Sequence, residues 1–336
     1  MGRPHVQIHA ANQIAALRQR LDGMLPRFEA FPGVLGLTLN GGLSRGYADH
    51  LSEIDVTFYL MPEAFQAWKK GKAPVAEGIT VLEGQLYDLK YVDYEAEKAR
   101  DWEAVALWDA SYAEVLYDPK GLIQALYEDK LGADFDPGAA EGLLMQCWWY
   151  NELAGEIWIH RGDALQGHSM FNQAVSVLVQ ALFVANREYI PHEKWLLHMS
   201  RSLAWRPADW ERRLGAAMRT GDLTTDSLRA RQIVIRELWQ EIDQRLIELY
   251  WPGLPVHGMQ RSTYEQFKLL VEAGSMTLDE WRERTGGRFP NRDPFHPVVR
   301  LEADRMVVDR EALLGLGPDA MYAWHYAVLR AVAEED

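Results

Sequence analysis

Two adjacent glycines separate two apolar runs near the N-terminus and limit what this part of the chain can form. The run GVLGLTL, residues 33–39, is typical of a buried strand, and Asn40, Gly41 and Gly42 end it. The run EIDVTFYL, residues 53–60, alternates between apolar and polar side chains, as does a strand with one face on a core. The sequence therefore predicts two successive strands, the first of which ends in a glycine turn.

The second of these strands carries two carboxylates on one face. Strand residues two apart point the same way, so Glu53 and Asp55 lie side by side, opposite the face that carries Ile54 and Val56. Neighbouring carboxylates resist joint ionisation unless water solvates them or a divalent cation binds them. The pair therefore indicates either an exposed polar strand face or a metal site.

The rest of the first 130 or so residues adds helices and further strands. Apolar spacing predicts helices over 12–30, 96–110 and 119–131, and a strand over 86–94, with residues 78–80 leading into its hairpin. The last strand supplies a third acid, Asp88, and we keep Asp93 as a fallback because its odd offset points it to the other face. These residues read as a small α/β domain.

From about residue 140 the pattern becomes helical. We expect helices over 141–160, 170–187 and 226–250 and a short helix that starts at Pro191, and we expect no strand. The tail contains helical stretches and a loop rich in proline and arginine at 286–297. The expected division is an α/β domain at 1–135, a helical bundle at 136–257 and a helical extension at 258–336.

Charge and composition exclude some classes of function. The 336 residues carry a formal net charge of −14, which disfavours binding to extended nucleic acid and suits either a cationic small substrate or simple solubility. We expect no membrane-spanning helix and no signal peptide, and the single cysteine, Cys147, fits a reducing compartment. A cytoplasmic location is the expectation, with a homodimer as the default from base rates.

The glycine turn and the acids together indicate a binding site more strongly than either feature does alone. Glycine lets the backbone approach a ligand closely, and the N–H groups of a segment that could start a helix at Ser44 attract anions. A Gly-Gly turn alone is most often a plain loop. A glycine turn followed by acids on two strands, however, is typical of a site for a triphosphate and Mg²⁺.

This segment resembles the signature of the nucleotidyltransferase superfamily, which includes DNA polymerase β and the bacterial aminoglycoside and lincosamide nucleotidyltransferases. The residues that carry the resemblance are Leu39-Asn40-Gly41-Gly42, then Ser44-Arg45-Gly46, then Glu53-Ile54-Asp55. Gly42 stands where serine is more usual, and Glu53 stands where aspartate is the commoner residue.

The resemblance implies an α+β fold, with a polymerase β-like mixed-sheet domain followed by an all-α helical bundle domain. It implies that Glu53, Asp55 and Asp88 bind one or two Mg²⁺ ions and take part in catalysis. It further implies transfer of a nucleoside monophosphate, AMP from ATP by preference, to a hydroxyl of an antibiotic-like acceptor.

The resemblance also assigns the nucleotide contacts. Gly41, Gly42 and Ser44 would hold the phosphates, and Lys194 would lie near the triphosphate. Arg45 could bind phosphate or could bridge to Asp49.

A catalytic base is needed to take the proton of the acceptor hydroxyl, and a carboxylate of the helical domain can supply it. Glu152 and Glu156 lie one turn apart, and we choose Glu152. The aromatic residues around it, Trp148 among them, could stack on a ring of the substrate or could form the core of the bundle.

Two other functions fit the same residues. The acceptor could be a tyrosine of a protein, as in the minimal-nucleotidyltransferase type of protein adenylyltransferase. The chain could also be a nucleotide-binding module without turnover, which the departures at Gly42 and Glu53 favour.

Overall fold

The computed structural model describes residues 2–132, 136–287, 292–319 and 322–335. They form two compact units, one of Met1–Asp136 with Leu182–Arg206 and one of Pro137–Ala181 with Pro207–Asp336. The expected division was different in two respects: the segment after residue 182 joins the first unit, and the tail after 257 does not separate from the bundle. Residues 133–135, at the first expected boundary, lie outside the described part.

The first unit is built on a mixed five-stranded sheet. Its order is β3-β4-β2-β1-β5, in which β2 and β4 are parallel and all other neighbours are antiparallel. The strands are β1 (Val34–Leu39), β2 (Ile54–Leu60), β3 (Gly78–Leu82), β4 (Gln85–Asp93) and β5 (Glu114–Tyr117). The α+β class and the mixed sheet are therefore as expected, and so are the two strands on either side of the glycine turn.

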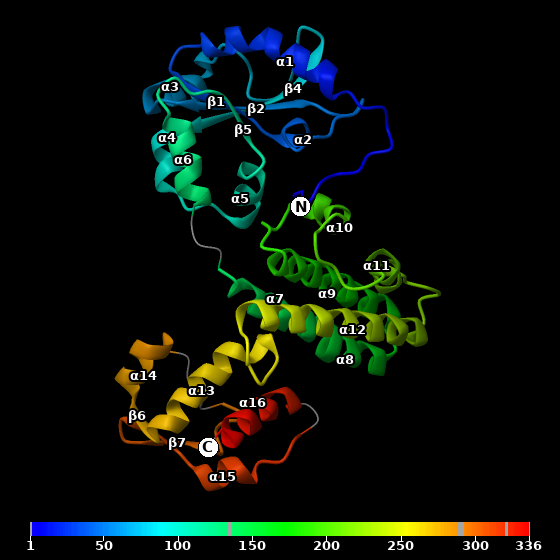
Figure 1. Ribbon diagram of the computed structural model, residues 1–336, viewed down its shortest axis with the longest axis vertical. Helices are drawn as coiled ribbons and strands as arrows, with labels where there is room; N and C mark the ends of the chain where they lie inside the picture. The colour runs from blue at the N-terminus through cyan, green and yellow to red at the C-terminus, as the bar shows by residue number, and fades with distance from the viewer. Residues whose placement is uncertain (1, 133–135, 288–291, 320–321, 336) are drawn as a thin grey trace. The chain divides into compact units, whose positions relative to one another are not determined.

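Helices cover both faces of this sheet (Figure 1). The helices of this unit are α1 (Ile14–Glu29), α2 (Gly41–Ser44), α3 (Pro62–Ala67), the π-helical η1 (Trp68–Lys72), α4 (Tyr94–Ala99), α5 (Ala104–Ala110) and α6 (Leu122–Leu131), together with α10 (Glu193–Ser200), which is not part of either core cluster on the sheet. The apolar side of α1 packs on the face that carries Ile54, Val56 and Phe58. Helices α4, α5 and α6 pack on the other face, near Tyr59 and Val92. The side chains of β2 thus alternate between two environments, as their sequence predicts.

The second unit begins as a helical bundle. Its elements are α7 (Ala139–Trp148), the π-helical η2 (Trp149–Ala154), α8 (Gly155–Arg161), α9 (Ala164–Ala185, whose last residues belong to the first unit), α11 (Trp210–Met218) and α12 (Thr225–Tyr250). Helix α12 begins with a capping box between Thr224 and Ser227, and it packs on α7, η2, α8 and α11. Its buried side, which includes Ile235, Leu238 and Ile242, follows the apolar spacing seen in the sequence.

The tail of the second unit contains a small sheet, which corrects the expectation of a purely helical extension. Its elements are η3 (Gly258–Gln260), α13 (Arg261–Ala273), β6 (Ser275–Thr277), α14 (Leu278–Thr285), β7 (Val299–Glu302), β8 (Arg305–Val308), α15 (Arg310–Gly315) and α16 (Ala323–Glu334). The sheet has the order β6-β8-β7. None of its strands exceeds four residues, which is too short for alternation to be recognised in the sequence. Part of the expected loop at 286–297, residues 288–291, lies outside the described residues.

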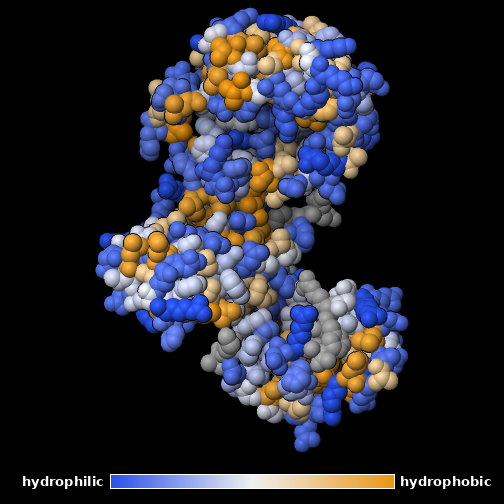
Figure 2. Space-filling model, turned by 180° about the vertical axis from the view of Figure 1, so that it is seen from behind, coloured by the Kyte–Doolittle hydropathy of each residue, from blue (hydrophilic) through white to orange (hydrophobic). Residues whose placement is uncertain are grey.

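One helix in the described part of the chain has the length and composition of a membrane span. This helix is α9, with a mean hydropathy of 1.2, and 67% of its most apolar window is buried inside the protein. Length and composition alone do not make it a span, because a buried core helix of the same length has the same composition. The burial of α9 is what a core helix shows. Elsewhere the visible surface is mainly hydrophilic, with hydrophobic residues in separate patches (Figure 2).

Candidate active site

The parallel pairing of β2 and β4 places two carboxylates opposite each other. Asp55 of β2 is the register partner of Asp88 of β4, so both side chains lie on the same face of adjacent strands. The fallback residue Asp93 has another task, because its carboxylate accepts hydrogen bonds from the amides of Glu95 and Ala96 and caps α4. The sheet therefore brings Asp55 and Asp88 together and leaves Asp93 at a helix end.

The glycine turn lies against the same carboxylate. Gly41 has a φ of +68°, and a Cβ there would overlap the Asp55 carboxylate. A Cβ on Gly42 would lie 3.0 Å from the Tyr47 ring, so the serine usual at this position would be crowded. The backbone amide of Asn40 donates to the Asp55 carbonyl at 3.0 Å and ties the turn to β2. Only glycine at position 41 leaves room for Asp55 where the structure places it.

The short helix α2 begins at Gly41 rather than at Ser44, where we expected a helix start. The Ser44 hydroxyl donates to the Gly41 carbonyl at 3.1 Å. Its proton therefore closes the turn instead of pointing at a ligand.

Negative charge accumulates around Asp55 without full compensation. Burial, followed by the charges of Glu53 and Asp88, raises the pKa of Asp55 to about 7, and Arg45 opposes this only in part. Within the described residues, neither Asp55 nor Asp88 accepts a side-chain hydrogen bond or forms an ion pair. A folded chain that holds two such acids together favours a proton or a cation at this place.

A fourth acid, Asp109 of α5, also reaches this region, and the sequence analysis missed it. Arg45 pairs with it, Nη1 to Oδ1 at 2.5 Å, with only 6% of the arginine side chain exposed, and the Asn40 amide donates to it at 3.2 Å. Arg45 thus pairs with Asp109 and not with Asp49, its expected acidic partner. The signal for Asp109 is slight: it is an acid in an otherwise apolar helix, 64 residues from Arg45.

Asp55, Asp88 and Asp109 line a pocket of about 200 Å³ on one face of the sheet. Asp55, Thr57, Asp88 and Lys90 line it from the strands, and side chains of α4, α5 and α6 close it from the other side. Lys90, an exposed cation on β4, was also not predicted; it is the register partner of Thr57, one step along the same face from Asp88. The pocket therefore combines carboxylates with a nearby positive charge.

Helix α10 belongs to the same unit as the glycine turn. The ring of Trp195 packs on Tyr47 edge to face, with 5.1 Å between centroids, and Tyr47 in turn lies against Gly42. Lys194, the neighbouring residue, is exposed at the start of this helix. The contact between Tyr47 and Trp195 thus brings the start of α10 next to the glycine turn, although the two are far apart in sequence.

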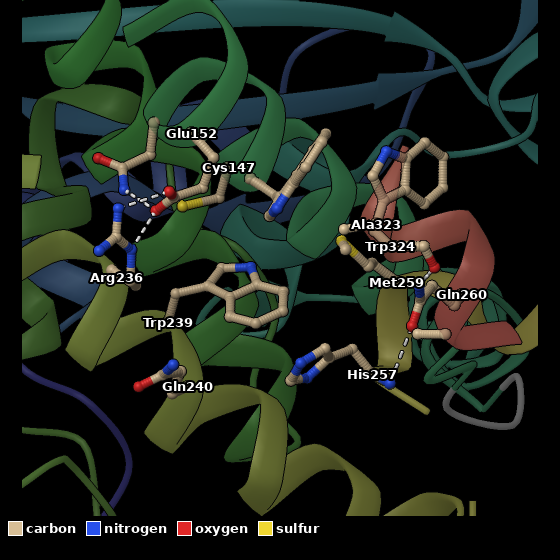
Figure 3. A pocket seen from close by; sticks show the side chains of 13 residues that line it. Cys147, Glu152, Arg236, Trp239, Gln240, His257, Met259, Gln260, Ala323 and Trp324 are labelled. Atoms are coloured by element: carbon tan, nitrogen blue, oxygen red, sulfur yellow. Dashed lines mark hydrogen bonds and ion pairs between the residues drawn. The ribbon is translucent and has the colours of Figure 1, made fainter. Parts of the chain in front are cut away.

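The structure offers less for the expected metal ligands and for Glu152, the expected catalytic base. In the described ranges no three His, Cys, Asp or Glu side chains stand close enough together to form a ready-made metal site. Glu53 lies just before β2, where its charge reaches Asp55. Glu152 belongs to the second unit, where it lines the pocket shown in Figure 3, and Arg236 holds both of its oxygens, at 2.8 and 2.7 Å.

Comparison with known proteins finds matches only among solved structures. No protein-family model matches the chain, and no curated protein is significantly similar to it in sequence. Among the matching solved structures is a nucleotidyltransferase-like protein from Exiguobacterium sibiricum 255-15, which is 10% identical. The alignment covers 87% of this chain and 98% of that one, with a TM-score of 0.43.

Proposed function

We propose that this chain is a Mg²⁺-dependent nucleotidyltransferase that moves AMP from ATP to a hydroxyl of a small-molecule acceptor and releases pyrophosphate. The observation that carries the proposal is the pairing of Asp55 with Asp88 beneath a glycine turn that only glycine can form. The raised pKa of Asp55 supports it, because a divalent cation would relieve the repulsion that causes it.

The donor set fits Mg²⁺. Carboxylate oxygens of Asp55 and Asp88, with Glu53 beside them, are hard ligands, and Mg²⁺ in phosphate-transfer sites is commonly held by one or two carboxylates plus substrate phosphates. A preformed cage of three side chains is therefore not required. When bound, the ion would polarise the α-phosphate for attack.

The chain's own groups supply the remaining tasks. Gly41 and Gly42 let the triphosphate approach the backbone, and Lys194 and Lys90 contribute positive charge to it. Asp88 takes the proton of the acceptor hydroxyl, since Glu152, our first choice for this role, is already bound to Arg236. Arg45 acts indirectly by holding Asp109 beside Asn40.

The acceptor is proposed from charge and from the resemblance. A net charge of −14 attracts a cationic molecule such as an aminoglycoside, and its modification would confer antibiotic resistance. Transfer to a protein tyrosine is the alternative acceptor. The cytoplasmic location and the homodimer stay predictions.

The test is a thermal-shift series with ATP, GTP, CTP and UTP, each with and without Mg²⁺. Wild type is compared with Asp55→Asn and with Asp22→Asn, which changes an exposed aspartate of α1. We expect a Mg²⁺-dependent stabilisation of about 2.7 kcal/mol at a hundredfold excess over Kd in wild type and in Asp22→Asn. Asp55→Asn should abolish it.

Other outcomes would decide against the proposal. No shift with any nucleotide would reject a nucleotide site, and a shift that survives in Asp55→Asn would favour a binding module without turnover. If the expected shift appears, mass spectrometry after incubation with ATP distinguishes a modified aminoglycoside from a modified tyrosine on the protein.

A further inference from the structure

Strand β3 forms one edge of the five-stranded sheet in the described part of the chain, and its exposed side is apolar. Ile79 and Val81 are 63% and 64% exposed, whereas Leu82 packs on the core beneath the opposite face. Leu86 of β4, the register partner of Val81, is a third exposed apolar side chain on the same face. We call Ile79, Val81 and Leu86 the edge patch. Apolar side chains grouped at an unpaired strand edge are typical of a surface that binds another strand.

The turn that joins β3 to β4 determines which backbone groups of β3 are unpaired. It has two residues, both with positive φ (+51° and +77°), which is the geometry of a type I′ hairpin turn. Leu82 and Gln85, on either side of it, are therefore a hydrogen-bonded pair. Such pairs alternate along an antiparallel ladder, so the N–H and C=O groups of Ile79 and Val81 point away from β4. Within the described residues, no other strand binds these groups.

This edge lacks the features that prevent strand edges from pairing in monomeric proteins. Charged side chains, proline and β-bulges are the usual protections. The strand reads GITVL, without charge or proline, and its register with β4 is unbroken. The opposite edge strand, β5, is different, because it carries Glu114 in an ion pair with Arg18 at 2.7 Å. The sheet thus has one edge with charge and one edge open to pairing.

The sequence of β3 is complementary to itself when two copies run antiparallel. If Thr80 lies opposite Thr80 of the other copy, Ile79 of each copy lies opposite Val81 of the other. Both of these pairs then exchange N–H···O=C bonds through the groups that point away from β4. Threonine opposite threonine is a favourable cross-strand pair, and β-branched side chains pack well on a pleated surface. The two edge patches become one apolar stripe across both copies.

Electrostatics permit this register. Two copies that each carry a net charge of −14 repel each other, so contact is favoured at a neutral strand. At the ends of the strand, Glu83 of one copy would lie beside Glu77 of the other. Glu77 is already bound by Lys69 at 2.5 Å and accepts a hydrogen bond from the Tyr91 amide. Lys69, with a half-exposed side chain, offers a positive charge to both acids.

We propose that β3 pairs with β3 of a second copy of this chain, antiparallel about Thr80, and joins the two five-stranded sheets into one. The contact is smaller than a standard interface of roughly 1,600 Å², so we expect a weak dimer with a Kd in the micromolar range. The pairing would extend the sheet face that carries Asp88, the register partner of Ile79, but it does not depend on the proposed transfer reaction.

The experiment measures the mass of the full chain by analytical ultracentrifugation between about 5 and 200 µM, the range in which a contact of this size is populated. The dimer fraction of wild type should rise across this range. Ile79→Lys and Val81→Lys should each weaken the association about tenfold or more, because a lysine at the edge places two cations opposite apolar groups. Leu51→Lys adds the same charge at a residue of the same unit that is 75% exposed and outside β3, and it should match wild type.

Hydrogen exchange on wild type tests the surface without a substitution. Amides in 78–82 should exchange more slowly at about 200 µM than at about 5 µM, whereas amides in 114–117, the other edge, should not change. A chain that stays monomeric throughout this range would overturn the proposal. So would lysine variants that associate as tightly as wild type, or a dimer that forms without protection of 78–82.

Discussion

At the scale of single residues, the candidate active site depends on a glycine, because any side chain at position 41 would occupy the space of a carboxylate. Gly41 has no Cβ, and the Asp55 carboxylate occupies the space in which that atom would lie. Its left-handed backbone is a second reason for glycine. The first reason concerns the acid and the second concerns only the turn, so the two can be separated by experiment.

Gly41→Ala should weaken Mg²⁺-dependent nucleotide binding at least tenfold, because the new methyl group displaces the Asp55 carboxylate. Gly46 supplies the matched control: its φ is +81°, but a Cβ there meets nothing within 4 Å. Both variants should lose about 1 kcal/mol of unfolding free energy from backbone strain. Nucleotide titrations that weaken equally in both would show that strain, and not the carboxylate, is responsible.

At the scale of elements, α10 is a helix distant in sequence that packs against the glycine turn through one of its side chains. Trp195 packs on Tyr47, and Lys194 lies beside it at the start of the helix. The glycine turn, β1, β2 and β4 could be predicted because each is specified by residues close together in sequence. Strand β5 was missed, since four residues within an apolar stretch do not show alternation.

The pairing of Arg45 with Asp109 could not be predicted for another reason. Arg45 belongs to the glycine motif, but Asp109 lies in locally unremarkable sequence, and only the packing of α5 on the sheet brings the two together. The same holds for Lys90, whose place in the pocket follows from the parallel register of β4 with β2.

Lys194→Gln should lower the affinity for nucleoside triphosphates about tenfold, which corresponds to about 1.4 kcal/mol, because a phosphate loses its cation. Affinity for the nucleoside without phosphates should not change. Lys120→Gln removes an exposed lysine elsewhere in the same unit and serves as the control. If calorimetric titrations show the same affinities for Lys194→Gln as for wild type, the helix does not contribute to phosphate binding.

At the scale of the whole molecule, two titratable groups in different units respond to pH in opposite directions. In the first unit the pKa of Asp55 is raised to about 7, so between about pH 4 and 7 the folded state holds a proton that the unfolded chain releases. Stability from this group falls as pH rises. In the second unit His168 is 2% exposed and bonded to the buried Arg231, and burial together with that cation lowers its pKa. Below about pH 6.5, His168 binds a proton in the unfolded chain but stays unprotonated in the folded protein. The free energy of unfolding therefore falls as pH drops.

Thermal unfolding from pH 5 to 8 without divalent ions should separate these effects. Asp55→Asn should remove the loss of stability that wild type shows as pH rises from 5 to 7, and adding Mg²⁺ to wild type should offset the same loss. His168→Gln should reduce the loss that appears as pH falls below 6.5 and leave the loss linked to Asp55 unchanged. Unchanged pH profiles in both variants would contradict this assignment of the two groups.

The path of the chain between the units has an evolutionary consequence. The polypeptide passes from one unit to the other between residues 136 and 137, again between 181 and 182, and once more between 206 and 207. A recombination event that exchanged everything after residue 136 would therefore also replace Trp195 and Lys194. The first unit therefore cannot be exchanged as one uninterrupted segment of the gene, because its residues 182–206 are encoded between two parts of the second unit.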